Sequence, residues 1–182
     1  MINTRVIHPV HAGFTLVETM VAITILVIAV VGPLYAVHRS VVASYTARDA
    51  LAATALAQEG MEYVRSVRDS NYLSNSSDWL SGLDTCIVTG PEGPSDFGCA
   101  VDPNPTPTIA ACASGGCAAL RLDSSYRYRQ SANAGYPVTR FARKVTISRV
   151  SSEAVLVTVA VSWSTLRIPY TVTVSEYLYN WQ

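Results

Sequence analysis

Apolar residues fill one uninterrupted stretch near the start of the chain. The eighteen residues 20–37 carry no charge, and Glu18 is the only charged residue between Arg5 and Arg39. A helix of this length spans about 27 Å, close to the roughly 30 Å hydrocarbon core of a bilayer. A buried core helix would show a polar stripe, and a secretory signal would place its small-residue cleavage site after a shorter apolar run. The pattern therefore predicts a membrane-spanning helix.

Beyond Arg39 the pattern stays helical but becomes amphipathic. Small and apolar residues recur at helical spacing, with Thr54 as one polar interruption, at Ala43, Ala47, Ala50, Ala57, Met61 and Val64. The run Asp69-Ser70-Asn71 is a plausible stop, so one helix is expected from residue 14 to 68, about 80 Å long. A domain of this size cannot bury all of it. The inner half must lie in lipid or against other helices.

The last 45 residues alternate between apolar and polar positions. Three period-two rows are visible: Phe141, Val145 and Ile147; Val155, Val157, Val159, Val161 and Trp163; Ile168, Tyr170, Val172 and Val174. Short connections at Ser151-Ser152 and Ser164-Thr165 predict an antiparallel meander. Its apolar face needs a cover, and the outer half of the helix is available. The predicted fold is α+β, a long N-terminal membrane-spanning helix with a C-terminal antiparallel sheet packed on its distal half, like a lollipop.

Four cysteines lie in the Ser-, Gly-, Pro- and Asn-rich stretch between helix and meander, where loops and short strands are expected. They are Cys86, Cys99, Cys112 and Cys117. An even count outside the membrane indicates two disulfides with three possible connectivities, of which nearest-neighbour pairing closes the shortest loops. A zinc site is the alternative, but the sequence has no Cys-x-x-Cys spacing and no histidine after position 38.

The composition argues against several classes of function but does not indicate a particular one. The 182 residues contain 13 Lys+Arg and 13 Asp+Glu, with 14% charged and 49% hydrophobic residues. This balance argues against a disordered polyelectrolyte and against nucleic-acid binding through excess positive charge. The three histidines, His8, His11 and His38, all precede the outer region, and its acids form no recognisable pair. We expect no enzyme activity, cofactor or metal.

The junction before the apolar run carries the strongest signal. Residues 12–26, AGFTLVETMVAITIL, resemble the N-terminal motif of type IV pilins and type II secretion pseudopilins: a short polar leader, a glycine, then an aromatic residue opening an apolar helix with Glu at its fifth position. The resemblance implies that prepilin peptidase cuts between Gly13 and Phe14 on the cytoplasmic side and methylates the new Phe14 amine. It also implies that Glu18 pairs with the Phe14 amine of a neighbouring subunit, since intramembrane acids usually have a functional partner.

Two further segments refine this expectation. Proline removes a backbone donor and clashes with the preceding turn, so a kink or local melting is expected at Gly32-Pro33. The stretch 57–72, AQEGMEYVRSVRDSNY, resembles minor pilins of the PilV type and I-type pseudopilins.

The expected organisation follows the chain. It comprises a leader (1–13), a transmembrane and filament-core helix (14–38), the amphipathic outer half of the helix (39–69), a disulfide-bearing region (70–137) and a β-meander (138–182). The implied function is that of a minor pilin or pseudopilin in a type IV pilus-like filament. Its partners would be prepilin peptidase, other pilin subunits, an assembly platform protein and the lipid bilayer. It would cross the cytoplasmic membrane once, with the C-terminal domain outside, before joining an extracellular or periplasmic filament.

Two alternatives stay open. The subunit could belong to a type II secretion pseudopilus, or it could be a membrane-anchored binding module or adhesin that never enters a filament.

Overall fold

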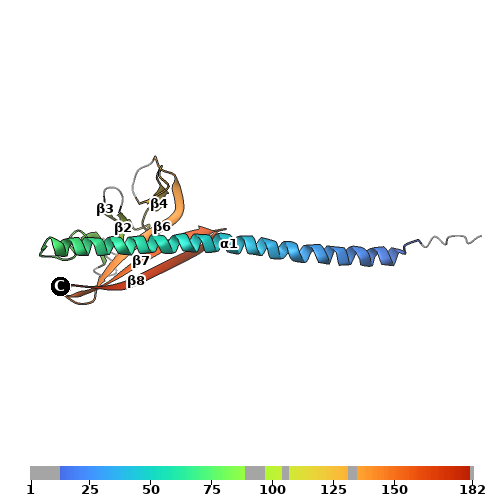
Figure 1. Ribbon diagram of the computed structural model, residues 1–182, viewed down its shortest axis with the longest axis horizontal. Coiled ribbons are helices and arrows are strands. Elements are labelled where there is room, and N and C mark those ends of the chain that lie inside the picture. The colour runs from blue at the N-terminus through green and yellow to red at the C-terminus, as the bar shows by residue number, and fades with distance from the viewer. Residues whose placement is uncertain (1–12, 89–96, 104–106, 131–134, 181–182) are drawn as a thin grey trace, which may run out of the picture. The chain divides into compact units, whose positions relative to one another are not determined.

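One long helix followed by a sheet makes up the fold, which is α+β as predicted (Figure 1). The computed structural model describes residues 13–88, 97–103, 107–130 and 135–180. Helix α1 runs from Leu16 to Leu73. The chain divides into two compact units after Tyr45, so that α1 contributes its inner part to the first unit and its outer part, with the sheet, to the second.

Strand β6 organises the sheet of the second unit. After the short helix η1 (Asp84–Cys86), the strands are β1 (Ile87–Val88), β2 (Cys99–Asp102), β3 (Thr108–Ala111), β4 (Ala119–Leu122), β5 (Tyr128–Arg129), β6 (Val138–Arg149), β7 (Ala154–Thr165) and β8 (Ile168–Tyr179). One edge of β6 pairs in turn with β4, β2 and β1, and the other pairs with β7. All of these pairings are antiparallel except β1 with β6.

The meander β6-β7-β8 confirms the period-two prediction. Opposite residues such as Val145 and Val159 pair in register, and the inward row of β7 is buried throughout. The connection between β7 and β8 differs from the expectation: the turn lies at Leu166 and Arg167, not at Ser164-Thr165. Both residues have positive φ, 52° and 67°. That is the backbone of a tight two-residue hairpin, and it is formed here without the usual Asn or Gly.

Strand β8 is covered less completely than β7. Among the described strands it pairs only with β7, and its inward residues Tyr170, Val172 and Val174 are half-buried while Ile168 is 55% exposed. Glu176 interrupts the same row and forms an ion pair with Arg65 of α1. Charged residues that point inward on an edge strand discourage pairing with another chain.

The buried stripe of α1 starts later than predicted. Ala50, Ala57, Met61 and Val64 pack on the sheet as expected, but Ala43 and Ala47 are exposed. The full set of buried helix residues is Ala53, Leu56, Ala57, Gly60, Met61 and Val64. Asp49 links this part of the helix to the sheet, because its Oδ2 accepts hydrogen bonds from Arg140 Nη1 at 2.8 Å and Thr165 Oγ1 at 3.1 Å.

The helix also ends five residues beyond the predicted Arg68. Asn75, at φ 51°, adopts the left-handed conformation. Its backbone N–H donates a hydrogen bond to the Tyr72 carbonyl, and the Ser76 N–H donates one to the Asn71 carbonyl at 2.9 Å. These two hydrogen bonds form a Schellman motif. The Asn71 side chain donates to the carbonyls of Trp79 and Ser81, and this ties the last turn to the following loop. Because of these contacts, the helix continues beyond the stop predicted at Asp69-Ser70-Asn71.

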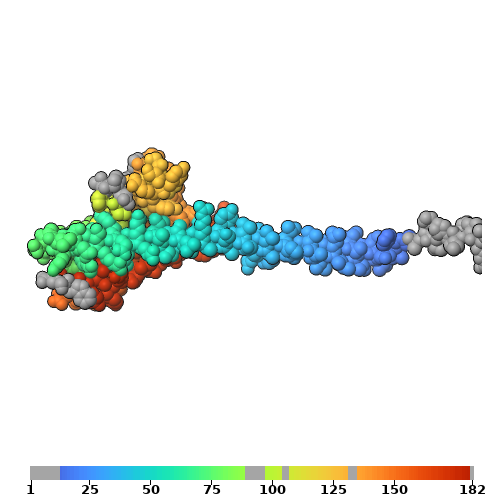
Figure 2. Space-filling model, viewed as in Figure 1, coloured from blue at the N-terminus to red at the C-terminus, as the bar shows by residue number. Residues whose placement is uncertain are grey.

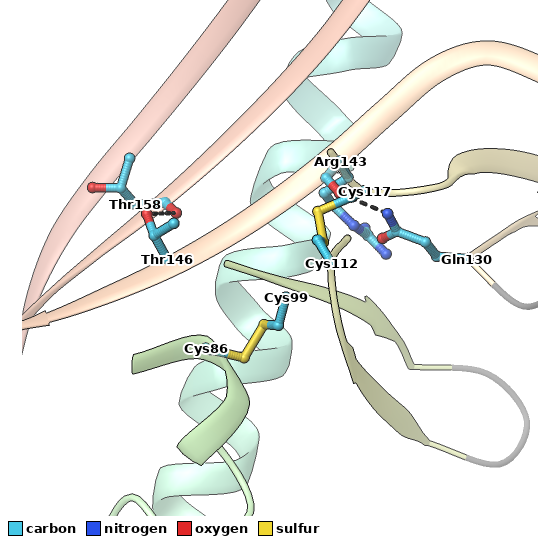
Figure 3. Close-up of a disulfide and its surroundings, with 8 residues drawn as sticks. All are labelled: Cys86, Cys99, Cys112, Cys117, Gln130, Arg143, Thr146 and Thr158. Carbon is cyan, nitrogen blue, oxygen red and sulfur yellow. Dashed lines mark hydrogen bonds between the residues drawn. A yellow bond between two sulfur atoms is a disulfide. The ribbon is translucent and has the colours of Figure 1, made fainter. Parts of the chain in front are cut away.

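Two disulfides join the loop-rich region, with the nearest-neighbour pairing (Figure 3). Cys86 is bonded to Cys99, and Cys112 to Cys117, with Cα atoms 4.7 and 4.5 Å apart. The first links η1 to the start of β2 inside the core, where both cysteines are fully buried. Disulfides of this kind stabilise a region with few apolar contacts of its own.

The turn between β4 and β5 is built around Asp123. Its Oδ1 accepts backbone hydrogen bonds from Ser125 at 2.8 Å and Arg127 at 2.9 Å, and its Oδ2 lies 3.2 Å from Arg127 Nε. The backbone bond from Arg127 lowers the pKa of this carboxyl below the ordinary 3.8, with help from Ser125 and the Arg127 charge and against the opposing effect of burial. Asp123 therefore stabilises the fold as a carboxylate.

This pKa predicts the sign of a pH dependence. A lowered pKa contributes stability that is complete above the unfolded value, near pH 4, and is lost as pH falls through the folded value. Asp123→Asn keeps one acceptor oxygen but removes the charge. We expect it to unfold at lower denaturant than the wild type at pH 7, and the gap to close progressively below about pH 4. Denaturant titrations across this range measure the gap, and a gap that widens on acidification would contradict the role of the carboxylate.

Candidate functional site

The first turn of α1 is capped by Thr15. Gly13, Phe14 and Thr15 lie outside the helix, which begins at Leu16. Thr15 Oγ1 accepts a hydrogen bond from the backbone N–H of Glu18 at 3.2 Å, and the Thr15 carbonyl accepts one from Thr19. Thr15 is thus the N-cap, and Glu18 occupies the third helical position, the Thr-x-x-Glu spacing of a capping box.

The segment around the expected cleavage point is open. Every residue from Gly13 to Val41 is exposed, and Phe14 is 81% exposed. A Cβ placed on Gly13 would meet nothing within 4 Å. The Gly13–Phe14 peptide bond therefore lies in accessible, non-helical backbone.

The inner part of α1 (Figure 2, blue) has many exposed large apolar side chains, and the hydroxyls of Thr19 and Thr24 in it are hydrogen-bonded. Thr19 Oγ1 donates to Leu16 O and Thr24 Oγ1 to Met20 O, both at 2.8 Å. Buried or lipid-facing polar groups are costly unless they are hydrogen-bonded in this way. The segment is long and apolar enough to cross a membrane.

Of the two outcomes expected at Gly32-Pro33, a kink or local melting, the structure tests the melting, and the kink stays a prediction. α1 continues through Pro33 without interruption, so the expectation of local melting there is wrong. Proline takes one N–H out of the ladder, but the turns on either side keep their own hydrogen bonds. In a helix of 58 residues, the loss of a single bond leaves the element intact.

Comparison with protein families identifies this segment. Residues 9–32 match the prokaryotic N-terminal methylation motif, the signal of type IV pilin-like proteins. The match supports processing of the chain by prepilin peptidase, as in type IV pilin-like proteins. Residues 1–12, which include the start of the motif and all of the expected leader except Gly13, lie outside the described residues. Comparison with curated proteins and with solved structures finds no match to the chain.

The structure does not gather the other polar candidates into a chemical site. His38 is exposed on α1, whereas His8 and His11 lie outside the described residues. All four cysteines are in disulfides, and no group of three or more metal-ligating side chains occurs in the described part of the chain.

Tyr63 is half-buried, and burial together with the Asp102 charge raises its pKa. A neutral phenol on the helix is suited to packing.

Arg143 is the structurally important residue that sequence reasoning missed. It is fully buried, and its guanidinium donates to Leu56 O at 3.0 Å, to Glu59 Oε2 at 2.6 Å and to Val101 O at 2.7 Å. Close packing continues at Gly60, where an added Cβ would lie 3.1 Å from Arg143 Cδ. A signal existed, because Arg143 falls on the inward row of β6 between Phe141 and Val145.

A second polar contact holds the strand that carries Arg143. Gln130 Nε2 donates to the Arg143 carbonyl at 2.6 Å (Figure 3) and to the Ala118 carbonyl at 3.1 Å. The network thus joins α1, β2, β6 and the segments beside β4 and β5. It fixes how the outer half of the helix sits on the sheet.

Proposed function

We propose that this chain is a minor pilin or pseudopilin, a non-catalytic subunit that is processed by prepilin peptidase and then packed into a type IV pilus-like filament. The observation that carries the proposal is the methylation motif at 9–32, set on the capped start of an exposed apolar helix. The resemblance of 57–72 to minor pilins of the PilV type and to I-type pseudopilins favours a minor role. The same resemblance keeps a type II secretion pseudopilus as the nearest alternative.

The helix start supports the proposed role of the Glu18 carboxylate. Cleavage after Gly13 would leave a charged amine on Phe14, one residue before the N-cap. The N-terminus of a helix already carries about half a positive charge, so a second positive charge there is unfavourable. Glu18, in the first turn, supplies the compensating charge. In a bundle of such helices, the carboxylate of one subunit would neutralise the amine of the next.

The second unit fits a place outside the cytoplasm. Both of its cystine pairs are closed, and structural disulfides persist in oxidising compartments. The inner helix would hold the subunit in the cytoplasmic membrane by a single span. On assembly its apolar surface would exchange lipid for the helices of other subunits, with no loss of burial.

Processing provides the direct test. Full-length chain is co-expressed in bacterial membranes with a prepilin peptidase, and the product is analysed by intact and N-terminal mass spectrometry. We expect a mature chain that begins with N-methylated Phe14. Gly13→Val should block the cut, because it places a branched side chain beside the scissile bond. Gly32→Ala is the matched control: it too adds a Cβ to an open position, and it should be processed like the wild type. A wild-type product that keeps Met1 would overturn the proposal.

A further inference from the structure

The inference concerns Thr15, which lies between the proposed scissile bond and Glu18. Its backbone is the last outside α1, and its side chain and carbonyl accept the hydrogen bonds from Glu18 N and Thr19 N, each at 3.2 Å. One residue therefore determines where the helix starts. The Gly13–Phe14 bond ends one residue before it.

We propose that Thr15 is a positioning residue for cleavage: its cap fixes the first helical residue at Leu16 and so keeps the Gly13–Phe14 bond in non-helical backbone, open to the peptidase. This proposal rests on the proposed processing by prepilin peptidase. A peptide bond inside a helical turn has its carbonyl engaged in the hydrogen-bond ladder and its flanking residues coiled. A hydrolytic site can take up a bond in extended backbone without first unwinding that turn.

The Thr15 cap fixes the boundary between the non-helical residues and α1. The first N–H groups of a helix have no intrahelical partner, and here Thr15 satisfies the Glu18 N–H. Close to lipid, an unsatisfied N–H is more costly than in water. Without the acceptor the first turn can fray, or the helix can restart upstream through Phe14. Either change lowers the fraction of chains with the bond presented one residue before the N-cap of a formed helix, and both displace Glu18.

The experiment compares four substitutions in the full-length chain, solubilised in detergent and incubated with purified prepilin peptidase. Thr15→Ser and Thr15→Asn keep a capping oxygen, whereas Thr15→Val keeps the branched shape without an acceptor and Thr15→Ala removes both. We expect Ser and Asn to be cut at rates similar to the wild type. Val and Ala should lose about fivefold in kcat/KM, the factor that corresponds to a lost cap. Hydrogen exchange at the Glu18 amide should accelerate in Val and Ala alone.

The series separates capping from direct recognition of the threonine. If the peptidase reads the side-chain shape, Val will be cut normally and Asn slowly, which would overturn the proposal. Equal rates for all five chains would overturn it as well. Cleavage of the wild type between Gly13 and Phe14 is scored first by mass spectrometry. If that cut is absent, the proposed function fails together with this inference; if it is present but the variants do not follow capping ability, only the inference fails.

Discussion

Glu18→Gln is expected to be processed normally and to be lost from filaments. Glutamine at the third helical position preserves the capping-box spacing with Thr15, so the helix start should be unchanged. What it removes is the negative charge that would neutralise the Phe14 amine of the neighbouring subunit. An uncompensated ammonium among apolar helices costs several kcal/mol, enough for at least a hundredfold loss of incorporation. Immunoblots of sheared surface filaments, against the cell-bound fraction, measure the ratio.

Two comparison variants make the Glu18 result specific. Glu62→Gln changes an exposed acid on the same helix, and its pairing with Arg65 lies near the surface, so we expect no effect on incorporation. Glu18→Ala removes the charge together with the long side chain and should be lost equally. Normal incorporation of Glu18→Gln would show that the charge is dispensable, as expected for a plain membrane anchor. If the variant remains uncut, Glu18 acts at processing instead.

Arg143→Ala should cause the largest loss of stability in the second unit. The guanidinium is fully buried and holds α1 to β2 and β6. Its removal leaves a cavity beside Gly60 and a buried Val101 carbonyl without its donor. Breaking a buried charged network typically costs about 3–5 kcal/mol. The fluorescence of buried Trp163, followed through denaturant unfolding of the processed chain in detergent, reports this change.

Lys144 supplies the matched control for Arg143. It is the next residue on β6 and lies on the exposed face. Lys144→Ala should change the unfolding free energy by less than about 0.5 kcal/mol. Arg143→Lys should fall between the two, because an ammonium keeps the charge but cannot reach three acceptors with a planar fork. Equal stability of the Arg143→Ala and Lys144→Ala proteins would show that the network adds no net stability.

The fold was largely predictable because its periodicities are strong. Eighteen consecutive uncharged residues predict a long apolar helix, and the alternation from Val155 to Trp163 predicts a strand with one buried face. The errors occurred at boundaries. The end of α1 depended on Asn75 in a Schellman motif, and the β7–β8 turn formed at Leu166 and Arg167 without turn-favouring residues. Local composition decides such positions weakly when tertiary contacts extend the elements.

The candidate site, too, was predictable only where the residues involved are close together in the sequence. The resemblance to the pilin motif implied roles for Gly13, Phe14 and Glu18, and the match at residues 9–32 supports the motif itself, which is local in the sequence. The uninterrupted passage of α1 through Pro33 was not predicted, since a proline rule does not weigh one lost bond against a long intact helix. Arg143 could have been noticed as a charge on an apolar row. Its acceptors could not, because Leu56 and Val101 lie 87 and 42 residues away.

The sequence by itself determined the apolar helix, the methylation motif and the meander, because each depends on residues close together in the chain. The tertiary structure alone decided where α1 meets the sheet, which side chains lock it there and how little of β8 is covered. Those outcomes depend on the length of the strands that face the helix and on charges that find partners across the fold. A local sequence pattern does not contain this information, because the residues that make these contacts are far apart in the chain.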